Sequence, residues 1–335
     1  MTACKDKYIC AVKNACSEVK LNHFPQIEAS DLLYRVIPLE YIYLPLSLQV
    51  SCYSENLNDS AAELIRLIDE RIAALEADEN RHGGSIAQKS DLPAAGLRLF
   101  IQANPGAGKT TFCRRLVLAL LQNDSAFFKK YSDENALFFN QDALPVLISC
   151  KSISGLAEKE LLSEDFEKLM YRLCAKSFGS RFSGISEDDF IELIGSCKPK
   201  KLCVVLDGWD EILDSEKETE FLKNFNRYLS EYPETDVVIT LRSGYSIPKL
   251  DKQGSEYMIS PLSEDDIREF CKKWCEIILS PNQRLAANCA SLAEQILCSG
   301  NPQIEEMAKN PLDLSLLLTI SKSTGRLPEN KAELF

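Results

Sequence analysis

The stretch from Leu97 to Leu121 constrains the fold of this chain more than any other. It opens with LRLFI, a short apolar run with the alternation typical of a buried strand, and continues with ANPGAGKT. The residues after Lys109 have helical spacing, with apolar side chains at Phe112, Leu116, Leu118 and Leu120. Strand, glycine-containing loop and helix is the context that a phosphate-binding loop requires.

The residue types of this loop suit a triphosphate. Gly106 and Gly108 allow the backbone to curl close to phosphate oxygens, and the helix N-terminus offers unpaired N–H groups. Lys109 is expected to bridge the β and γ phosphates, and the Thr110 hydroxyl to bind Mg²⁺. The alternative is a helix capped by a glycine turn, with no ligand. The predicted binding loop comprises Ala103, Asn104, Pro105, Gly106, Ala107, Gly108, Lys109, Thr110 and Thr111.

The composition narrows the class of protein. The chain has 335 residues, is 45% hydrophobic and 26% charged, and carries a formal net charge of -12. Broad binding to nucleic acids or anionic membranes needs a basic face, which such a charge disfavours. Because no apolar run is long enough to cross a bilayer or to serve as a signal peptide, we expect a cytoplasmic protein that does not bind membranes.

The cysteines are numerous but do not form a familiar pattern. Thirteen are scattered through predicted helices and strands, which indicates reduced, buried thiols rather than a disulfide framework. Four of them, Cys271, Cys275, Cys289 and Cys298, cluster late in the chain, but their spacing fits no standard zinc motif.

The remaining periodicity predicts a parallel α/β sheet with helices on both faces, followed by a small all-helical domain. Ahead of the loop we expect a helix within residues 1–30, extended structure over 32–50 and an amphipathic helix that begins with a capping box at Ser60 to Glu63. The expected domain boundaries are a lead-in over 1–95, a core over 96–258, a helical lid over 259–322 and the start of a further, truncated element over 323–335. Within the core the expected strands are 144–149, 202–206 and 237–241, and the expected helices are 166–178, 190–197 and 218–232.

A second motif lies about a hundred residues after the loop, in the run LCVVLDGWDEI. Asp207 ends a buried apolar strand, a position from which an aspartate reaches the Mg²⁺ of a phosphate-loop protein. Asp210 and Glu211 follow one short turn later, where a carboxylate can orient or deprotonate an attacking water. The alternative is an acidic turn that neither binds a metal ion nor takes part in catalysis.

A third candidate follows the strand of the run VVITLRS. Arg242 stands just past the strand end, where it can contact a γ-phosphate and report its presence. A solvated surface arginine is the alternative.

On these motifs the chain resembles the NACHT family of signal-transducing STAND NTPases, found in animal inflammasome receptors and bacterial antiphage systems. The resemblance covers about residues 35–335. It rests on ANPGAGKTT, on LDGWDE, on ITLRS, on SPLSEDDIREF, and on NPLDLSLLL followed by LPENKAELF. AAA+ ATPases place the glutamate directly after the aspartate, so the D-G-x-D-E spacing distinguishes the two groups.

This resemblance implies an ATP/ADP switch with an AAA+-like core and a helical lid. Family members rest closed on ADP, exchange it for ATP when triggered, and assemble to activate an effector. Carried over by motif, Lys109 and Thr110 bind phosphate and Mg²⁺, Asp207 supports the metal, Asp210 and Glu211 serve hydrolysis, Arg242 is a sensor, and Pro311 touches the nucleotide from the lid. The implied partner is a second copy of the chain.

Two departures from the family pattern stand out. The T-[ST]-R-P sensor motif is T-L-R-S here, and no histidine follows His82 to hold an ADP phosphate. Effector and sensor domains are expected on a longer chain or on separate partners. The leading hypothesis is therefore a slowly hydrolysing NACHT switch module of an innate immune, antiphage protein. The alternatives are an AAA+-like mechanical or chaperone ATPase and a non-hydrolysing nucleotide-binding scaffold.

Overall fold

The computed structural model describes residues 2–20, 36–50, 96–135, 137, 139–161, 165–197, 202–278, 291–324 and 326–328. Its main sheet has six strands in the spatial order β3-β8-β4-β7-β6-β5. In that order the strands are β3 (Leu48–Val50), β8 (Ser255–Ile259), β4 (Arg98–Ala103), β7 (Asp236–Arg242), β6 (Leu202–Asp207) and β5 (Leu144–Ser149).

Five of these strands are mutually parallel, as predicted, and the edge strand β3 is antiparallel to β8. The register aligns Ala103 at the end of β4 with Arg242 at the end of β7. It also aligns Asp207 at the end of β6 with Ser149 at the end of β5. The carboxyl ends of the parallel strands therefore meet along one edge, which is where α/β sheets bind ligands.

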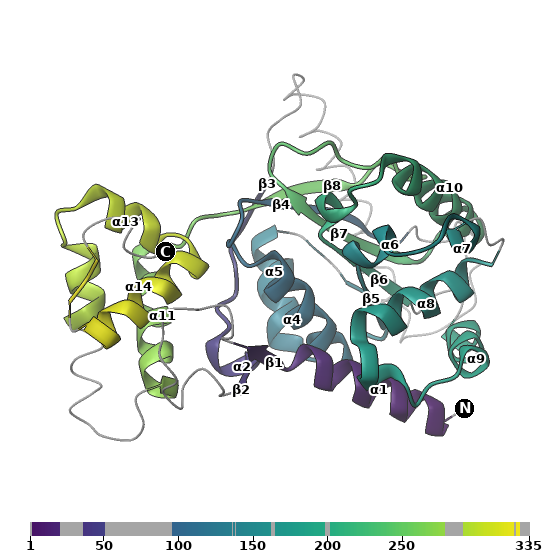
Figure 1. Ribbon diagram of the computed structural model, residues 1–335, viewed down its shortest axis with the longest axis horizontal. Coiled ribbons are helices and arrows are strands. Elements are labelled where there is room, and N and C mark those ends of the chain that lie inside the picture. The colour runs from purple at the N-terminus through teal and green to yellow at the C-terminus, as the bar shows by residue number, and fades with distance from the viewer. Residues whose placement is uncertain are drawn as a thin grey trace, which may run out of the picture.

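Helices cover both faces of the sheet (Figure 1). The strands β4 and β6 are buried almost throughout, which requires cover on both faces. Chain order and right-handed crossovers place α4 (Lys109–Gln122) and α5 (Ser125–Asn135) on one face, and α8 (Phe166–Phe178) and α10 (Ser215–Glu231) on the other. The connections also contain α6 (Lys151–Ser154), α7 (Glu158–Leu161), η2 (Gly179–Phe182), α9 (Glu187–Cys197) and η3 (Trp209–Glu211).

The N-terminal helix α1 (Thr2–Cys16) packs into the main core, because Tyr8, Val12 and Cys16 are fully buried there. The Tyr8 hydroxyl donates to the main-chain oxygen of Pro145 at 2.7 Å. A small antiparallel sheet follows, made of β1 (Glu18–Lys20) and β2 (Val36–Pro38).

One part of the predicted extended segment is helical. The turn α2 (Leu39–Ile42) closes with a hydrogen bond from Tyr43 N to Leu39 O at 2.9 Å. Both Leu39 and Ile42 are buried, so tertiary packing overrides the extended pattern at this turn.

A second hydrophobic cluster lies in the helical part of the chain, at the left of Figure 1. This part contains α11 (Glu264–Ile278), a helix over 291–297, α13 (Pro302–Ala308) and α14 (Pro311–Thr324). A capping box opens α11: the main-chain N–H of Ser263 donates to Asp266 Oδ2 at 2.9 Å, and Asp266 N donates to Ser263 Oγ at 3.2 Å.

The segment 42–48 joins the two clusters. Ile42 and Leu44 pack into the helical cluster, whereas Tyr43, Leu46 and Leu48 pack into the main core. This strap, residues 42–48, is thus attached to both parts of the molecule.

Some predictions fall outside the described residues. They are the amphipathic helix that begins with the capping box at 60–63, and residues 329–335 of the expected last element. Among described residues, no helix is both long and apolar enough to cross a membrane, and no cluster of metal-ligating side chains occurs. Ten described cysteines are free, as predicted, but Cys10 and Cys298 are exposed rather than buried. The expectation of reduced thiols is wrong at Cys275, which is disulfide-bonded.

Candidate functional site

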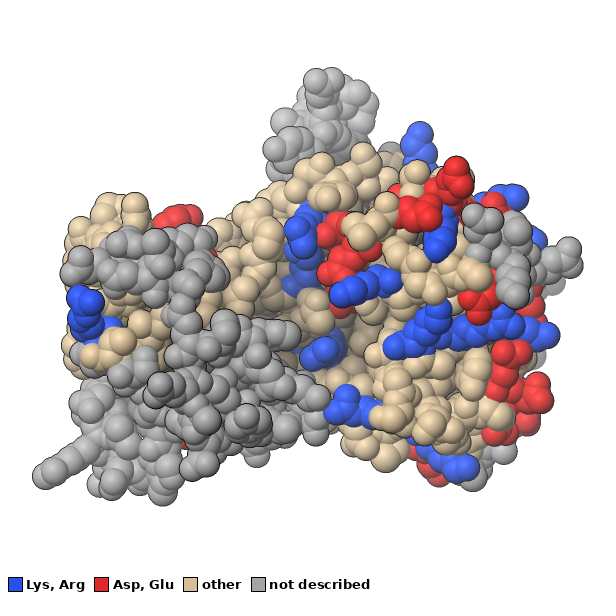
Figure 2. Space-filling view, in the orientation of Figure 1, with Lys and Arg blue, Asp and Glu red and all other residues tan. Residues whose placement is uncertain are grey.

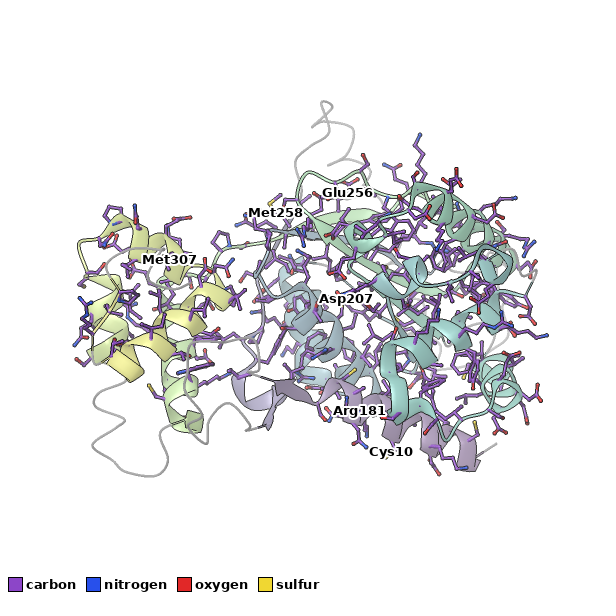
Figure 3. All side chains as sticks on the ribbon, viewed as in Figure 1. Cys10, Arg181, Asp207, Glu256, Met258 and Met307 are labelled. Carbon is purple, nitrogen blue, oxygen red and sulfur yellow. The ribbon has the colours of Figure 1, made fainter. Side chains whose placement is uncertain are left out.

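A cavity of about 500 Å³ lies at the carboxyl edge of the sheet, between the core and the helical part. Its walls come from the loop after β4, the ends of β6 and β7, the strap, α11 and the start of α14. Figure 3 labels Asp207, which lines this cavity from the end of β6 in the core. The cavity therefore needs both parts of the chain.

The predicted phosphate loop forms one wall. Gly106 and Gly108 adopt φ angles of +79° and +98°, which side chains disfavour. A Cβ on Gly108 would lie 3.2 Å from Leu46 Cδ1, so the strap packs directly on the loop. The Lys109 ammonium donates to the main-chain oxygens of Ala103 and Asn104, at 2.8 and 3.3 Å. Burial lowers its pKa, and the carboxylate of Asp210 opposes that shift.

The acidic end of β6 lies opposite the loop. Thr240 Oγ1 donates to Asp207 Oδ1 at 2.9 Å and accepts from Gly208 N at the same distance. This pair fixes the Asp207 carboxylate while Asp207 still lines the cavity, as does the exposed Thr110. A hydroxyl and a carboxylate are hard oxygen ligands, and with water molecules they suit Mg²⁺.

Asp210 and Arg242 are held together. Asp210 Oδ2 accepts from Arg242 Nε at 2.8 Å, and Asp210 Oδ1 accepts from the main-chain N–H of Arg242 at 2.9 Å. The Asp210 side chain is 3% exposed and that of Arg242 is 50% exposed. Glu211 lines the same cavity and is exposed.

The opposite end of the cavity is apolar. Phe270 and Trp274 of α11 are stacked, with ring centroids 6.2 Å apart, and they line the cavity together with Ile42 and Leu44 of the strap. Leu312, at the start of α14, is also exposed to it. The site thus has a polar end on the core and an apolar end shared with the helical part.

Hydrogen bonds to carbonyl groups fix the strap in place. Three side chains of α5 donate to it: Lys130 Nζ to Pro45 O at 3.0 Å, Tyr131 Oη to Leu46 O at 3.1 Å, and Asn135 Nδ2 to Leu48 O at 2.8 Å. Lys273 of α11 donates to Tyr43 O at 2.9 Å. The strap is therefore bound to the core and to the helical part by separate contacts.

Most of the predicted site residues come together here. Those that line the cavity are Pro105, Gly106, Gly108, Lys109, Thr110, Thr111, Asp207, Asp210, Glu211, Arg242 and Pro311. Two others, Asn104 and Ala107, line a second cavity of about 630 Å³ behind the loop. Ala103 is buried in β4.

The sequence reasoning missed the apolar end. The sequence motifs assign no binding role to Phe270, Trp274 or Asn310, although Asn310 opens the run NPLDLSLLL. The pair Asn310 and Pro311 is a usable signal, because asparagine before proline is typical of a helix start.

One known family matches the part of the chain that contains the phosphate loop and the ends of β6 and β7. Residues 88–242 match the family model described as "Nephrocystin 3, N-terminal", a stretch of less than half the chain that includes the loop, Asp207 and Arg242. The chain has a P-loop NTPase fold. No curated protein matches the sequence significantly.

Several solved structures are similar to the chain. A RuvB variant of Thermotoga maritima has 12% identity and a TM-score of 0.36, over 80% of this chain and 66% of its own. PCH-2 of C. elegans has 14% identity and a TM-score of 0.40, over 87% of this chain and 67% of its own. Cdc6p of Pyrobaculum aerophilum has 16% identity and a TM-score of 0.32, over 69% of this chain and 58% of its own. The chain thus spans about two thirds or less of these proteins, and at such scores the likeness carries no functional argument.

Proposed function

We propose that this chain is an ATP-binding, slowly hydrolysing switch module of a NACHT-like signalling protein, in which nucleotide controls assembly with further copies. The observation that carries the proposal is the two-ended cavity. Lys109, Asp207 and Arg242 surround its polar end, and aromatic and aliphatic side chains surround the other. A nucleoside triphosphate has the same division, with an anionic phosphate chain and a flat base.

An adenine base fits the apolar end. Among the described residues, the main-chain N–H and C=O of Leu44 take part in no hydrogen bond, although Leu44 is buried and lines the cavity. One donor and one acceptor side by side complement the acceptor and amino group on the edge of adenine. We therefore favour ATP over GTP.

The residues at the polar end fit Mg²⁺. Thr110 and Asp207 would hold the ion, which would neutralise phosphate charge when bound. Lys109 would leave the carbonyls of Ala103 and Asn104 to contact the β and γ phosphates. Glu211, exposed in the cavity, would orient or deprotonate the attacking water.

The switching role rests on the shared walls of the cavity. Opening the helical part away from the core would separate Trp274 and Leu312 from Lys109, and hence the base subsite from the phosphate subsite. A nucleotide that contacts both walls stabilises the closed arrangement by mass action. Pro311 would touch the nucleotide from this side, as the family resemblance implies.

The signalling part of the proposal follows the NACHT resemblance: a cytoplasmic innate immune or antiphage role, with effector and sensor functions on other segments or partners. On the face shown in Figure 2, acidic and basic side chains are interspersed over the core. Such a face, together with the net charge of -12, does not favour broad nucleic-acid binding.

One observation favours a second candidate, a nucleotide-binding scaffold without meaningful hydrolysis. Both carboxylate oxygens of Asp210 are engaged by Arg242, which leaves Glu211 as the acid of this turn for water activation. If the wild-type protein releases phosphate no faster than a Glu211→Gln variant, the scaffold is favoured. Rapid turnover without assembly would favour an AAA+-like mechanical ATPase instead.

The experiment that tests the switch measures molar mass by light scattering, with Mg-ATP, with Mg-ADP and without nucleotide. We expect a larger mass with Mg-ATP than with Mg-ADP, and no such difference in a Lys109→Ala variant. Binding of ATP without any change in mass would leave nucleotide binding intact and contradict the assembly role.

A further inference from the structure

Asn310 occupies the junction between the helical part and the phosphate loop. Its side-chain oxygen caps α14, accepting from Leu312 N at 3.0 Å and from Asp313 N at 3.3 Å. Its side-chain nitrogen donates to the main-chain oxygen of Pro105 at 2.9 Å. One amide group therefore fixes the start of a lid helix and a carbonyl of the loop together.

A second contact runs beside it. Leu312 N also donates to the main-chain oxygen of Gly106 at 3.3 Å. A Cβ on Gly106 would lie 2.7 Å from Asn310 Oδ1 and 2.9 Å from Leu312 Cβ, closer than Cβ atoms approach such neighbours. Because Gly106 has no side chain, the helical part can pack closely against the loop, and a phosphate can also approach it.

These contacts stand between two cavities. Pro311 lines both the candidate nucleotide cavity and the cavity behind the loop, while Asn310 lines only the latter. Met258 of β8 and Met307 of α13, labelled in Figure 3, lie on the two sides of this rear cavity. Pro311, at the docked start of α14, is therefore part of the wall between the two cavities.

We propose that Asn310 is a positioning residue that couples the phosphate loop to the helical part and slows nucleotide release. This inference rests on the proposed nucleotide site and assigns a role to Asn310, a residue of the run NPLDLSLLL to which the family resemblance gave none. Because the loop carbonyls of Pro105 and Gly106 are held from the helical part, opening that part releases the loop backbone that contacts phosphate. Nucleotide retention then depends on the docking of the helical part on the phosphate loop.

The chain offers a matched pair of variants for the test. Asn310→Ser keeps a good helix cap and no charge, but serine is too short to cap α14 and reach Pro105 O together. Asn301→Ser makes the same change at the cap of α13, where the side chain accepts from Gln303 N at 3.0 Å. Thermal midpoints of both variants, measured by circular dichroism, report on folding.

Two readouts decide the proposal. In protein without nucleotide, hydrogen exchange of peptides covering 104–112 and 310–318 should be faster in Asn310→Ser than in wild type or Asn301→Ser. Release of a fluorescent ADP analogue should be faster by about two- to tenfold, the range of one hydrogen bond. Exchange or release equal to wild type in Asn310→Ser would overturn the coupling. If the wild-type protein does not bind nucleotide, the proposed function is wrong. Hydrogen exchange of the protein without nucleotide would still test whether Asn310 docks the helical part on the loop.

Discussion

Asp210 binds Arg242 twice, through the guanidinium and through the main-chain N–H. The pair joins the turn after β6 to the end of β7, so two candidate motifs that are far apart in sequence form one unit. Arg242 can contact a γ-phosphate only if its side chain leaves this partner or shares it. The ion pair therefore sets the resting position of the candidate sensor.

Removing the Asp210 carboxylate should destabilise the fold. In Asp210→Ala the main-chain N–H of Arg242 loses its acceptor, and we expect the free energy of unfolding to fall by about 1–2 kcal/mol. Denaturant unfolding measures this change. Glu211→Ala is the matched control: its exposed side chain should cost less than about 0.5 kcal/mol. Equal losses in the two variants would show that the pair contributes nothing.

Glu211→Gln should separate binding from chemistry. The amide keeps the size of the side chain but cannot take a proton, so we expect unchanged ATP affinity and phosphate release slowed by about a hundredfold or more. Single-turnover phosphate release measures the effect. A double variant, Asp210→Asn with Glu211→Gln, should also retain ATP binding. An undiminished rate in the single variant would remove the catalytic role from Glu211.

Tryptophan emission should report on the apolar end of the cavity. The chain has two tryptophans. Both are buried, but Trp274 lines the cavity, whereas Trp209 does not, and its Nε1 donates to Glu218 Oε1 at 2.8 Å. ATP should change the emission of wild type and of Trp209→Phe but not of Trp274→Phe. A nucleotide signal that survives in Trp274→Phe and disappears in Trp209→Phe would place the base elsewhere.

Alkaline pH should destabilise the protein because burial raises the pKa of several groups. Desolvation raises the pKa of the Cys16 and Cys271 thiols to about 12, from 9.0. Between these values the folded state keeps protons that the unfolded state loses. Stability should thus be full below pH 9 and fall as pH rises, by about 1.4 kcal/mol per unit for each such group. Denaturant unfolding at pH 8 and pH 10 measures this fall, and Cys271→Ala should reduce it; stability that rises over this range would contradict it.

The sequence predicts an element well where the segment itself has a clear hydrophobic pattern. The apolar run 144–149 and the amphipathic run 166–178 became β5 and α8 with the predicted bounds. By contrast, β8 has the sequence SEYMI, which is too short and polar to indicate a strand, and it exists because β4 and β3 flank it. The helix α5 was not predicted either, although its side chains of Lys130, Tyr131 and Asn135 hold the strap.

The same division applies to the site. Lys109, Asp207 and Arg242 follow strand ends, so the parallel sheet itself predicts that they converge. Trp274 and Asn310 reach the site only because the helical part folds back over the loop, and no periodicity encodes that contact. The sequence therefore predicts the phosphate end of the cavity better than its base end.

The measurement that tests the central claim most directly is the nucleotide content of the protein after exposure to Mg-ATP. Wild type and Lys109→Ala are incubated with Mg-ATP, desalted and denatured, and the released nucleotide is quantified by anion-exchange chromatography. Circular dichroism confirms that both are folded. We predict close to one ATP or ADP per wild-type chain and almost none in Lys109→Ala, because the ammonium on the loop is lost. Equal amounts in the two proteins, or none in wild type, would contradict the account.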